Sequence, residues 1–179
     1  MREKNIFTAR QIALYGLFIA LVYIATRWIN IPGPTAGGLF HLGNVMAFTI
    51  AIVFGKKAGA ISAAVGMALF DLSTGFAVWA PSTFIIRFAM GYIIGYLACD
   101  DNIKINKNIK IAISIIIATI IMIGGYYITE VIILGNWIAP LQSVWSNFIQ
   151  CVVGAVGAVP ISLVLKSGFK ARKIIVDNL

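Results

Sequence analysis

Residues Gly66 to Gly91 read GMALFDLSTGFAVWAPSTFIIRFAMG, and this stretch places two charges where a membrane helix should have none. Asp71 ends one apolar segment, and Arg87 lies inside the next one. A charged side chain near the centre of a bilayer costs about 2.5–3.5 kcal/mol on insertion scales, so such charges normally face the interior of a helix bundle. Glu130, near the end of a later apolar run, is a third charge of this kind. We therefore expect the three charges to lie around one pocket, with the other segments as its walls.

The composition predicts an integral membrane protein. Of the 179 residues, 60% are hydrophobic and only 11% are charged, whereas roughly a quarter of the residues of a globular domain are charged. No long polar tract interrupts the chain, so we predict a single domain, residues 1–179, embedded in a lipid bilayer. Two cysteines and one histidine make neither a disulfide nor a metal site credible, and we expect no cofactor and no metal.

Apolar runs predict an all-α membrane protein with six transmembrane helices, since about 20 residues cross a bilayer. The expected boundaries are 11–29, 41–54, 58–72, 82–99, 111–134 and 141–165. The second and third runs are too short to fill the bilayer, so we expect a helical hairpin that turns at Gly55. The connection Asn30–Phe40 is rich in proline and glycine, which predicts a loop in the space that this hairpin leaves.

Basic residues gather on one side of the predicted helices. They lie in the N-terminal arm, the hairpin turn, the connection after the fourth helix, and the tail: Arg2, Lys4, Arg10, Lys56, Lys57, Lys104, Lys107, Lys110, Lys166, Lys170, Arg172 and Lys173. Short loops rich in Lys and Arg stay in the cytoplasm. We therefore predict a multi-pass protein of the bacterial plasma membrane with both termini in the cytoplasm. The net charge of +8 then reflects topology, and we expect no nucleic-acid partner.

In this orientation the three charged residues Asp71, Arg87 and Glu130 lie in the outer half of the membrane, together with the tryptophans. Simpler interpretations stay open: the tryptophans form an interfacial belt, Asp71 faces water, or Arg87 and Glu130 form a structural ion pair. Asn147 and Gln150 share one helix face, and their amides need partners in a neighbouring helix or in a ligand. The candidate ligand-binding residues are Asn44, Asp71, Trp79, Arg87, Tyr126, Glu130, Trp137, Trp145, Asn147 and Gln150.

Small residues four positions apart mark places where helices approach closely. We expect most of these pairs, such as Gly91 and Gly95, to be internal packing seams. Gly16 and Ala20 differ, because the first helix carries almost no polar residue that would tie it to the pocket. This pair is the best candidate for a surface that docks another protein.

Catalytic motifs are missing from the sequence. A phosphate-binding loop ending at Lys56 would need glycine at position 50 and Ser or Thr at 57, but the chain has Ile50 and Lys57. No Gly-x-Ser-x-Gly elbow is present, and His41 is the only imidazole base. We predict no catalytic residues and no enzymatic activity, and a membrane enzyme is the weakest hypothesis.

Several motifs occur in the order found in a known family. They are His41-Leu-Gly-Asn44, the series Gly55, Gly59, Gly66, Asp71, Gly75 and Pro81, and Asn147-x-x-Gln150-x-x-x-Gly154. Together with six helices, they resemble the substrate-binding S components of energy-coupling factor (ECF) transporters, from about Leu14 to Leu165. Members of that family commonly show His-x-Gly-Asp at the first motif, whereas Asn44 carries no charge.

The resemblance implies an S-component-like bundle that acts as a high-affinity receptor for a water-soluble vitamin or vitamin precursor. Similar members suggest pyridoxine-like, hydroxymethylpyrimidine-like or riboflavin-like ligands, and aromatic walls with amide donors suit such flat nitrogen heterocycles. The resemblance also implies docking through Gly16 and Ala20 onto a transmembrane coupling protein driven by two ATPase subunits. The alternative is a structural membrane protein of a bacterial envelope complex, whose polar groups serve packing only.

Overall fold

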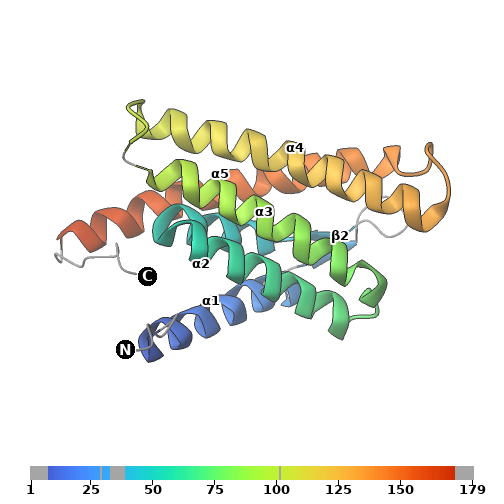
Figure 1. Ribbon diagram of the computed structural model, residues 1–179, viewed down its shortest axis with the longest axis horizontal. Coiled ribbons are helices and arrows are strands. Elements are labelled where there is room, and N and C mark those ends of the chain that lie inside the picture. Colours follow the sequence, from blue (N-terminus) through green and yellow to red (C-terminus); the bar gives the residue numbers. More distant parts are fainter. Residues whose placement is uncertain (1–7, 29, 33–38, 101, 172–179) are drawn as a thin grey trace, which may run out of the picture.

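The computed structural model describes residues 8–28, 30–32, 39–100 and 102–171. This part of the chain forms a bundle of long helices with one short strand pair (Figure 1). The elements are α1 (Ala9–Trp28), β1 (Asn30–Pro32), β2 (Leu39–His41), α2 (Gly43–Ser73), the 3-10 helix η1 (Ala77–Trp79), α3 (Ala80–Cys99), α4 (Lys107–Leu134) and α5 (Leu141–Ala171). Within the described residues, five helices are long and apolar enough to cross a membrane.

The helix α2 turns back on itself at Gly55, where φ is 84°. A Cβ built on Gly59 would lie 2.5 Å from the Cβ of Ala51, although these residues would be about 12 Å apart along a straight helix. Glycine adopts this left-handed φ without the steric penalty of a side chain. The runs predicted as 41–54 and 58–72 therefore correspond to the two legs of α2, while six membrane crossings remain a prediction.

Several helices extend beyond the apolar runs that predicted them. The helix α4 begins at Lys107 rather than at 111, and α5 continues to Ala171 rather than ending at 165. At the start of α4, the side chain of Asn106 accepts a hydrogen bond from the backbone N–H of Asn108, as an N-cap does. Apolar sequence marks the part of a helix that suits lipid, whereas backbone hydrogen bonding continues into the polar ends.

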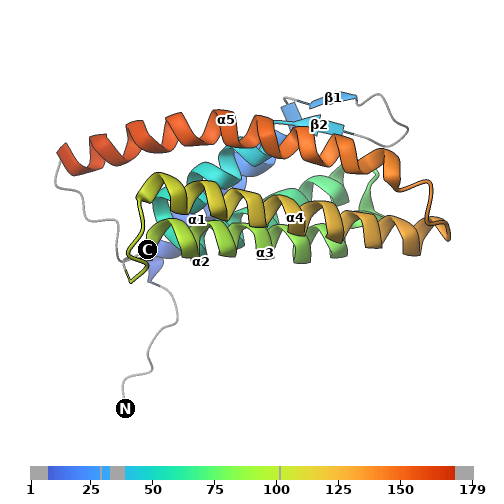
Figure 2. The same cartoon turned by 90° about the horizontal axis from the view of Figure 1, so that it is seen from above.

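The connection predicted as a plain loop contains two short antiparallel strands, and that prediction is wrong for the strand residues. Asn30 pairs with His41, and Pro32 pairs with Leu39. Proline is tolerated because a two-stranded ladder consists only of edge strands. Residues 33–38 lie outside the described part of the chain. The strand β2 contacts α5 and α1, and Figure 2 shows the strand pair at one edge of the bundle.

Glycines bring α2 and α3 together at backbone distance. A Cβ on Gly91 would collide with the backbone of Gly59, and one on Gly95 would collide with the backbone of Gly55 and Lys56. These residues were predicted as internal seams, and the contacts confirm it. The helix α2 is much more buried than α1, α4 or α5, so it forms the centre of the bundle. Outward faces of the other helices expose large apolar side chains such as Ile120, as lipid-facing surfaces do.

Substitution at the seam should separate the two central helices. We expect Gly91→Ala to lower the apparent unfolding temperature of the detergent-solubilised protein, because overpacking costs about 1–3 kcal/mol. Gly124→Ala is the matched control: nothing lies within 4 Å of a Cβ at that position, and alanine has the higher helix propensity. An equal loss of stability in both variants would show that the seam is not tightly packed.

Candidate ligand-binding site

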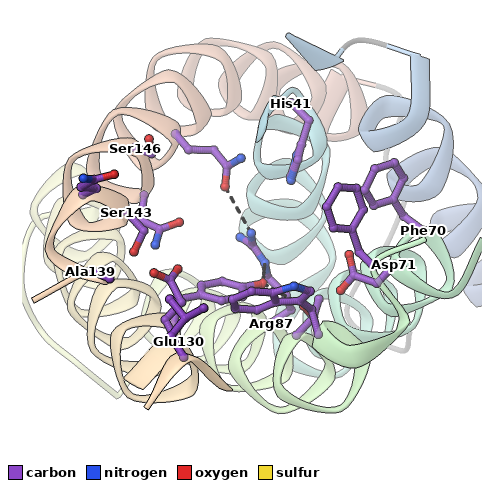
Figure 3. A pocket seen from close by; sticks show the side chains of 16 residues that line it. His41, Phe70, Asp71, Arg87, Glu130, Ala139, Ser143 and Ser146 are labelled. Atoms are coloured by element: carbon purple, nitrogen blue, oxygen red, sulfur yellow. Dashed lines mark hydrogen bonds between the residues drawn. The ribbon is translucent and has the colours of Figure 1, made fainter. Parts of the chain in front are cut away.

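A cavity of about 410 Å³ opens among β2, η1 and the helices α2 to α5. Figure 1 shows the beginning of α3 and the turn between α4 and α5 at the same end of the bundle, and residues from both places line the cavity. Pockets for small molecules typically measure about 300–1,000 Å³, so this cavity lies at the small end of the range. Its walls are the side chains shown in Figure 3.

Most of the residues predicted from the sequence line this cavity. They come from α2, η1, α3, α4 and α5, and they are Asp71, Trp79, Arg87, Tyr126, Glu130, Asn147 and Gln150. The three intramembrane charges therefore surround one pocket, as expected. Asp71 is only 9% exposed, so it does not simply face water at a helix end.

The other three predicted residues lie outside the lining. Asn44 is buried behind the cavity. Trp137 is 69% exposed and packs against Tyr127, while Trp145 is 64% exposed and stacks on Phe148. The positions of these two tryptophans fit the interfacial belt better than a ligand contact.

Further lining residues were not predicted, although some had a signal in the sequence. They are His41, Phe70, Phe76, Thr83, Leu134, Ala139, Gln142, Ser143 and Ser146. Ser143 and Ser146 stand at helical spacing before Asn147 and Gln150, which places all four on one face of α5. His41 belongs to the same motif as Asn44. The residues around Ala139 lie in a turn, where helical periodicity gives no information.

The Arg87 guanidinium lies at the base of the cavity, 3% exposed, and is held by neutral groups. Its Nη1 donates to Asn44 Oδ1 at 2.6 Å and its Nη2 to Gln150 Oε1 at 3.2 Å. Its Nε donates to the Tyr126 hydroxyl at 3.2 Å, and the dashed line in Figure 3 marks the bond to Gln150. Through these hydrogen bonds Arg87 links α3 to α2, α4 and α5.

Asn44, which lies outside the cavity lining, holds both Arg87 and the backbone of α5 in place. Its amide nitrogen donates to the backbone carbonyl of Gln150 at 3.3 Å, while its oxygen accepts from Arg87. Gly154 lets α5 come this close, since a Cβ there would lie 2.7 Å from the Cβ of Asn44. Asn44 therefore acts on the cavity through Arg87.

The two carboxylates of the site are not ion-paired with Arg87 in the described part of the chain. Figure 3 shows Asp71 and Glu130 on opposite sides of the cavity, with Arg87 between them. Thr83 lies close to Asp71 in the cavity wall, and Ser143 lies close to Glu130. The structural ion pair between Arg87 and Glu130, which the sequence left open, does not form in this structure.

His41 brings the strand pair to the cavity. Its Nδ1 accepts a hydrogen bond from the backbone N–H of Gly43 at 3.2 Å, which leaves Nε2 as the protonated nitrogen. Burial, and then the positive charge of Arg87, lower the pKa of His41 to about 3. His41 is therefore neutral at physiological pH. In Figure 3 it points toward the cavity from the side opposite Arg87.

A metal centre is not suggested by these residues. Within the described ranges, no group of three or more His, Cys, Asp or Glu side chains is placed to hold a metal ion. The expectation that the chain uses no cofactor stays a prediction.

Comparison with known proteins decides the class of the chain. The family model described as "ECF-type riboflavin transporter, S component" matches residues 6–167. The chain belongs to this family. It is 27% identical over 157 residues to the thiamine precursor transporter HmpT of Lactococcus lactis subsp. cremoris (strain MG1363), covering 87% of this chain and 86% of that protein. It is also 27% identical over 146 residues to an uncharacterized protein in gap 3′ region of Pyrococcus woesei, covering 81% and 94% respectively.

Membership of the S component family confirms the resemblance drawn from the motifs. An S component is the substrate-specific subunit of an ECF transporter for a vitamin or vitamin precursor, so this chain is a transport subunit and not an enzyme. S components are embedded in the membrane and work with a coupling protein and ATPases. The packing-only hypothesis of an envelope protein is thereby set aside.

The lowered pKa of His41 should make stability depend on pH. Since the folded pKa of about 3 lies below the unfolded value, which is about 6.5, the unfolded chain binds a proton that the folded chain does not. Stability should therefore fall as the pH is lowered below about 6.5. We expect the apparent unfolding temperature to drop more between pH 7.5 and pH 5.5 in the native S component than in His41→Asn, which keeps an oxygen acceptor for Gly43 but does not titrate. Equal drops would contradict a depressed pKa.

Proposed function

We propose that this S component binds a flat nitrogen heterocycle of the thiamine-precursor class in the cavity and presents it for ATP-driven uptake. The observation that carries the proposal is a pocket in which aromatic walls meet hydrogen-bonding groups on several sides. Trp79 and Tyr126 supply rings, while Asn147 and His41 supply polar edges. Aromatic stacking is worth about 0.5–1.5 kcal/mol beyond the area it buries. The substrate class in the name of the Lactococcus relative supports the same ligand chemistry.

The size of the cavity supports a small ligand. A volume of about 410 Å³ suits a single ring with short substituents, such as an aminopyrimidine or a pyridine. Riboflavin, which has three fused rings and a long polyol chain, needs a larger volume than such single-ring compounds. We therefore place hydroxymethylpyrimidine-like and pyridoxine-like compounds ahead of riboflavin-like ones.

Ligand roles follow from which groups are already engaged. Gln150 binds Arg87 through its side chain and Asn44 through its backbone, so its main task is to hold the guanidinium. Asn147 lies on the same face of α5 and lines the cavity. We assign Asn147 to the edge of the ring and Trp79 to its face.

The proposed topology has six crossings, with both termini in the cytoplasm and the cavity opening outward. Figure 1 shows the first turn of α1 and the last turns of α5 at the same end of the bundle. The reversal at Gly55 adds a crossing within α2 if both legs span the bilayer. Lys56, Lys57 and Lys110 belong to the predicted basic side, which suits the cytoplasmic face of a bacterial plasma membrane.

We assign docking of the coupling protein, which two ATPase subunits would drive, to the outer face of α1. Gly16 and Ala20 are exposed, and nothing lies within 4 Å of a Cβ at Gly16. The inner face of α1 instead packs on α2, where Val22 contacts Gly66. Small residues on an outward face let a second helix approach closely in lipid.

Ligand binding can be measured on the purified chain without partners. We expect an aminopyrimidine thiamine precursor to quench tryptophan fluorescence, because Trp79 lines the cavity. Trp79→Leu should weaken binding at least about tenfold through the loss of stacking and buried area. Trp145→Leu is the matched control, since Trp145 is exposed outside the lining. Flat titrations for precursors of thiamine, pyridoxine and riboflavin alike would refute a receptor of this type.

Docking can be separated from binding by enlarging the small residues of α1. Gly16→Trp and Ala20→Trp should leave ligand affinity unchanged but abolish co-purification with the coupling protein and ATP-driven uptake, because a bulky ring prevents close helix approach. Ile120→Trp on the outward face of α4 is the control. If the α1 variants lose ligand affinity in parallel with uptake, α1 is an internal wall and the docking assignment is wrong.

A further inference from the structure

We propose that the cavity selects ligands that carry a positive charge, and that Asp71 and Glu130 receive that charge. The inference rests on the proposed ligand cavity and adds the charge class of its occupant. It starts from which polar atoms of the site have partners and which have none.

The donors of the site are largely engaged. Each nitrogen of the Arg87 guanidinium already has an oxygen acceptor, on Tyr126, Asn44 and Gln150. Its Nη1 also lies 3.3 Å from the Met122 sulfur. An anionic ligand group would have to displace these neutral partners to bind the guanidinium bidentately.

The acceptors of the site are not engaged in the same way. Asp71 Oδ2 is buried and has no hydrogen-bond partner among the described residues, and the Asp71 side chain lines the cavity. A buried charge without a partner is costly, so native structures normally supply one. Oδ2 itself is closed off from water, while the rest of the Asp71 side chain lines the cavity, so a ligand that brings an N–H donor or a positive charge to this carboxylate from the cavity removes the cost.

Glu130 lies on the other side of the cavity from Asp71, as Figure 3 shows. The Ser143 hydroxyl beside it donates its one proton to the backbone carbonyl of Pro140 at 2.9 Å, so that proton does not serve Glu130. Neither carboxylate is paired with a basic side chain in the described ranges. A planar ligand lying between Asp71 and Glu130 meets a carboxylate at each end.

When both carboxylates are ionised, the charges around the cavity add up to an excess of negative charge. Its titratable lining consists of two carboxylates, Asp71 and Glu130, one guanidinium, Arg87, and His41, which is neutral. In a water-poor site this excess attracts cations and repels anions. A planar N–H fork, as in an amidinium or a protonated aminopyrimidine, matches carboxylate geometry with charge-assisted hydrogen bonds. The same excess repels phosphate esters, so the receptor takes the unphosphorylated form of its ligand.

Three isosteric probes test the charge class without knowledge of the natural ligand. Benzamidine, benzamide and benzoate have nearly the same flat shape, but at pH 7.5 they carry a positive charge, no charge and a negative charge. We expect benzamidine to bind the purified S component at least about tenfold more tightly than benzamide, and benzoate to bind most weakly. The readouts are calorimetric titration and the shift in unfolding temperature.

Isosteric variants locate the preference. Asp71→Asn and Glu130→Gln should each reduce the advantage of benzamidine over benzamide by about tenfold or more, because each removes one carboxylate of the cavity. Asp100→Asn is the matched control, because Asp100 follows α3 at the opposite end of the bundle and does not line the cavity. This variant also removes one negative charge, and it should leave the preference for benzamidine over benzamide unchanged.

The outcomes separate this inference from the proposed function. Benzoate binding as tightly as benzamidine, or a benzamidine preference that survives in both cavity variants, overturns the inference even if vitamin precursors bind. A benzamidine preference that Asp71→Asn abolishes supports the inference even if every vitamin precursor fails to bind, and in that case the proposed ligand class is wrong.

Discussion

The structure depends on one buried guanidinium. A positive charge within an apolar bundle is expensive unless its donors are satisfied, and Arg87 meets this constraint by drawing oxygen atoms from three neighbouring helices. Asn44 on α2, Tyr126 on α4 and Gln150 on α5 are thereby fixed at one depth. The bundle closes around them on one side through small residues such as Gly154. On the other side, polar and aromatic side chains line the cavity.

Asn44 sets the charge of this centre. Members of the family commonly carry an aspartate at this position, which would neutralise the guanidinium directly. An amide satisfies the Nη1 donor just as well, at 2.6 Å, but leaves its charge for more distant groups to balance. Asp71 and Glu130 flank Arg87 without touching it, as Figure 3 shows. The site is therefore a set of charged side chains that do not contact one another, with the cavity between them.

The sequence predicted what depends on local pattern. Apolar runs placed the helices, Gly55 marked the reversal of α2, and Asp71, Arg87 and Glu130 did converge on one cavity. The depth of a residue in the membrane, however, does not tell which way its side chain points. Trp145 precedes Asn147 by two residues, which is about 200° around a helix, so periodicity already placed it away from the cavity. The strand pair of β1 and β2 carried no such signal, because its proline and glycine content is also typical of loops.

The glycine seam between α2 and α3 leaves less room for substitution than the walls of the cavity do. At Gly59 and Gly91 the backbones themselves touch, so any side chain there pushes the helices apart. Part of the cavity wall, such as Asp71, Trp79 and Ala139, instead stands near a helix end or in a turn, where substitutions change shape and polarity without moving the centre. Ligand preference can therefore diverge on a constant frame. This chain is similar both to a family described by riboflavin and to a relative named for a thiamine precursor.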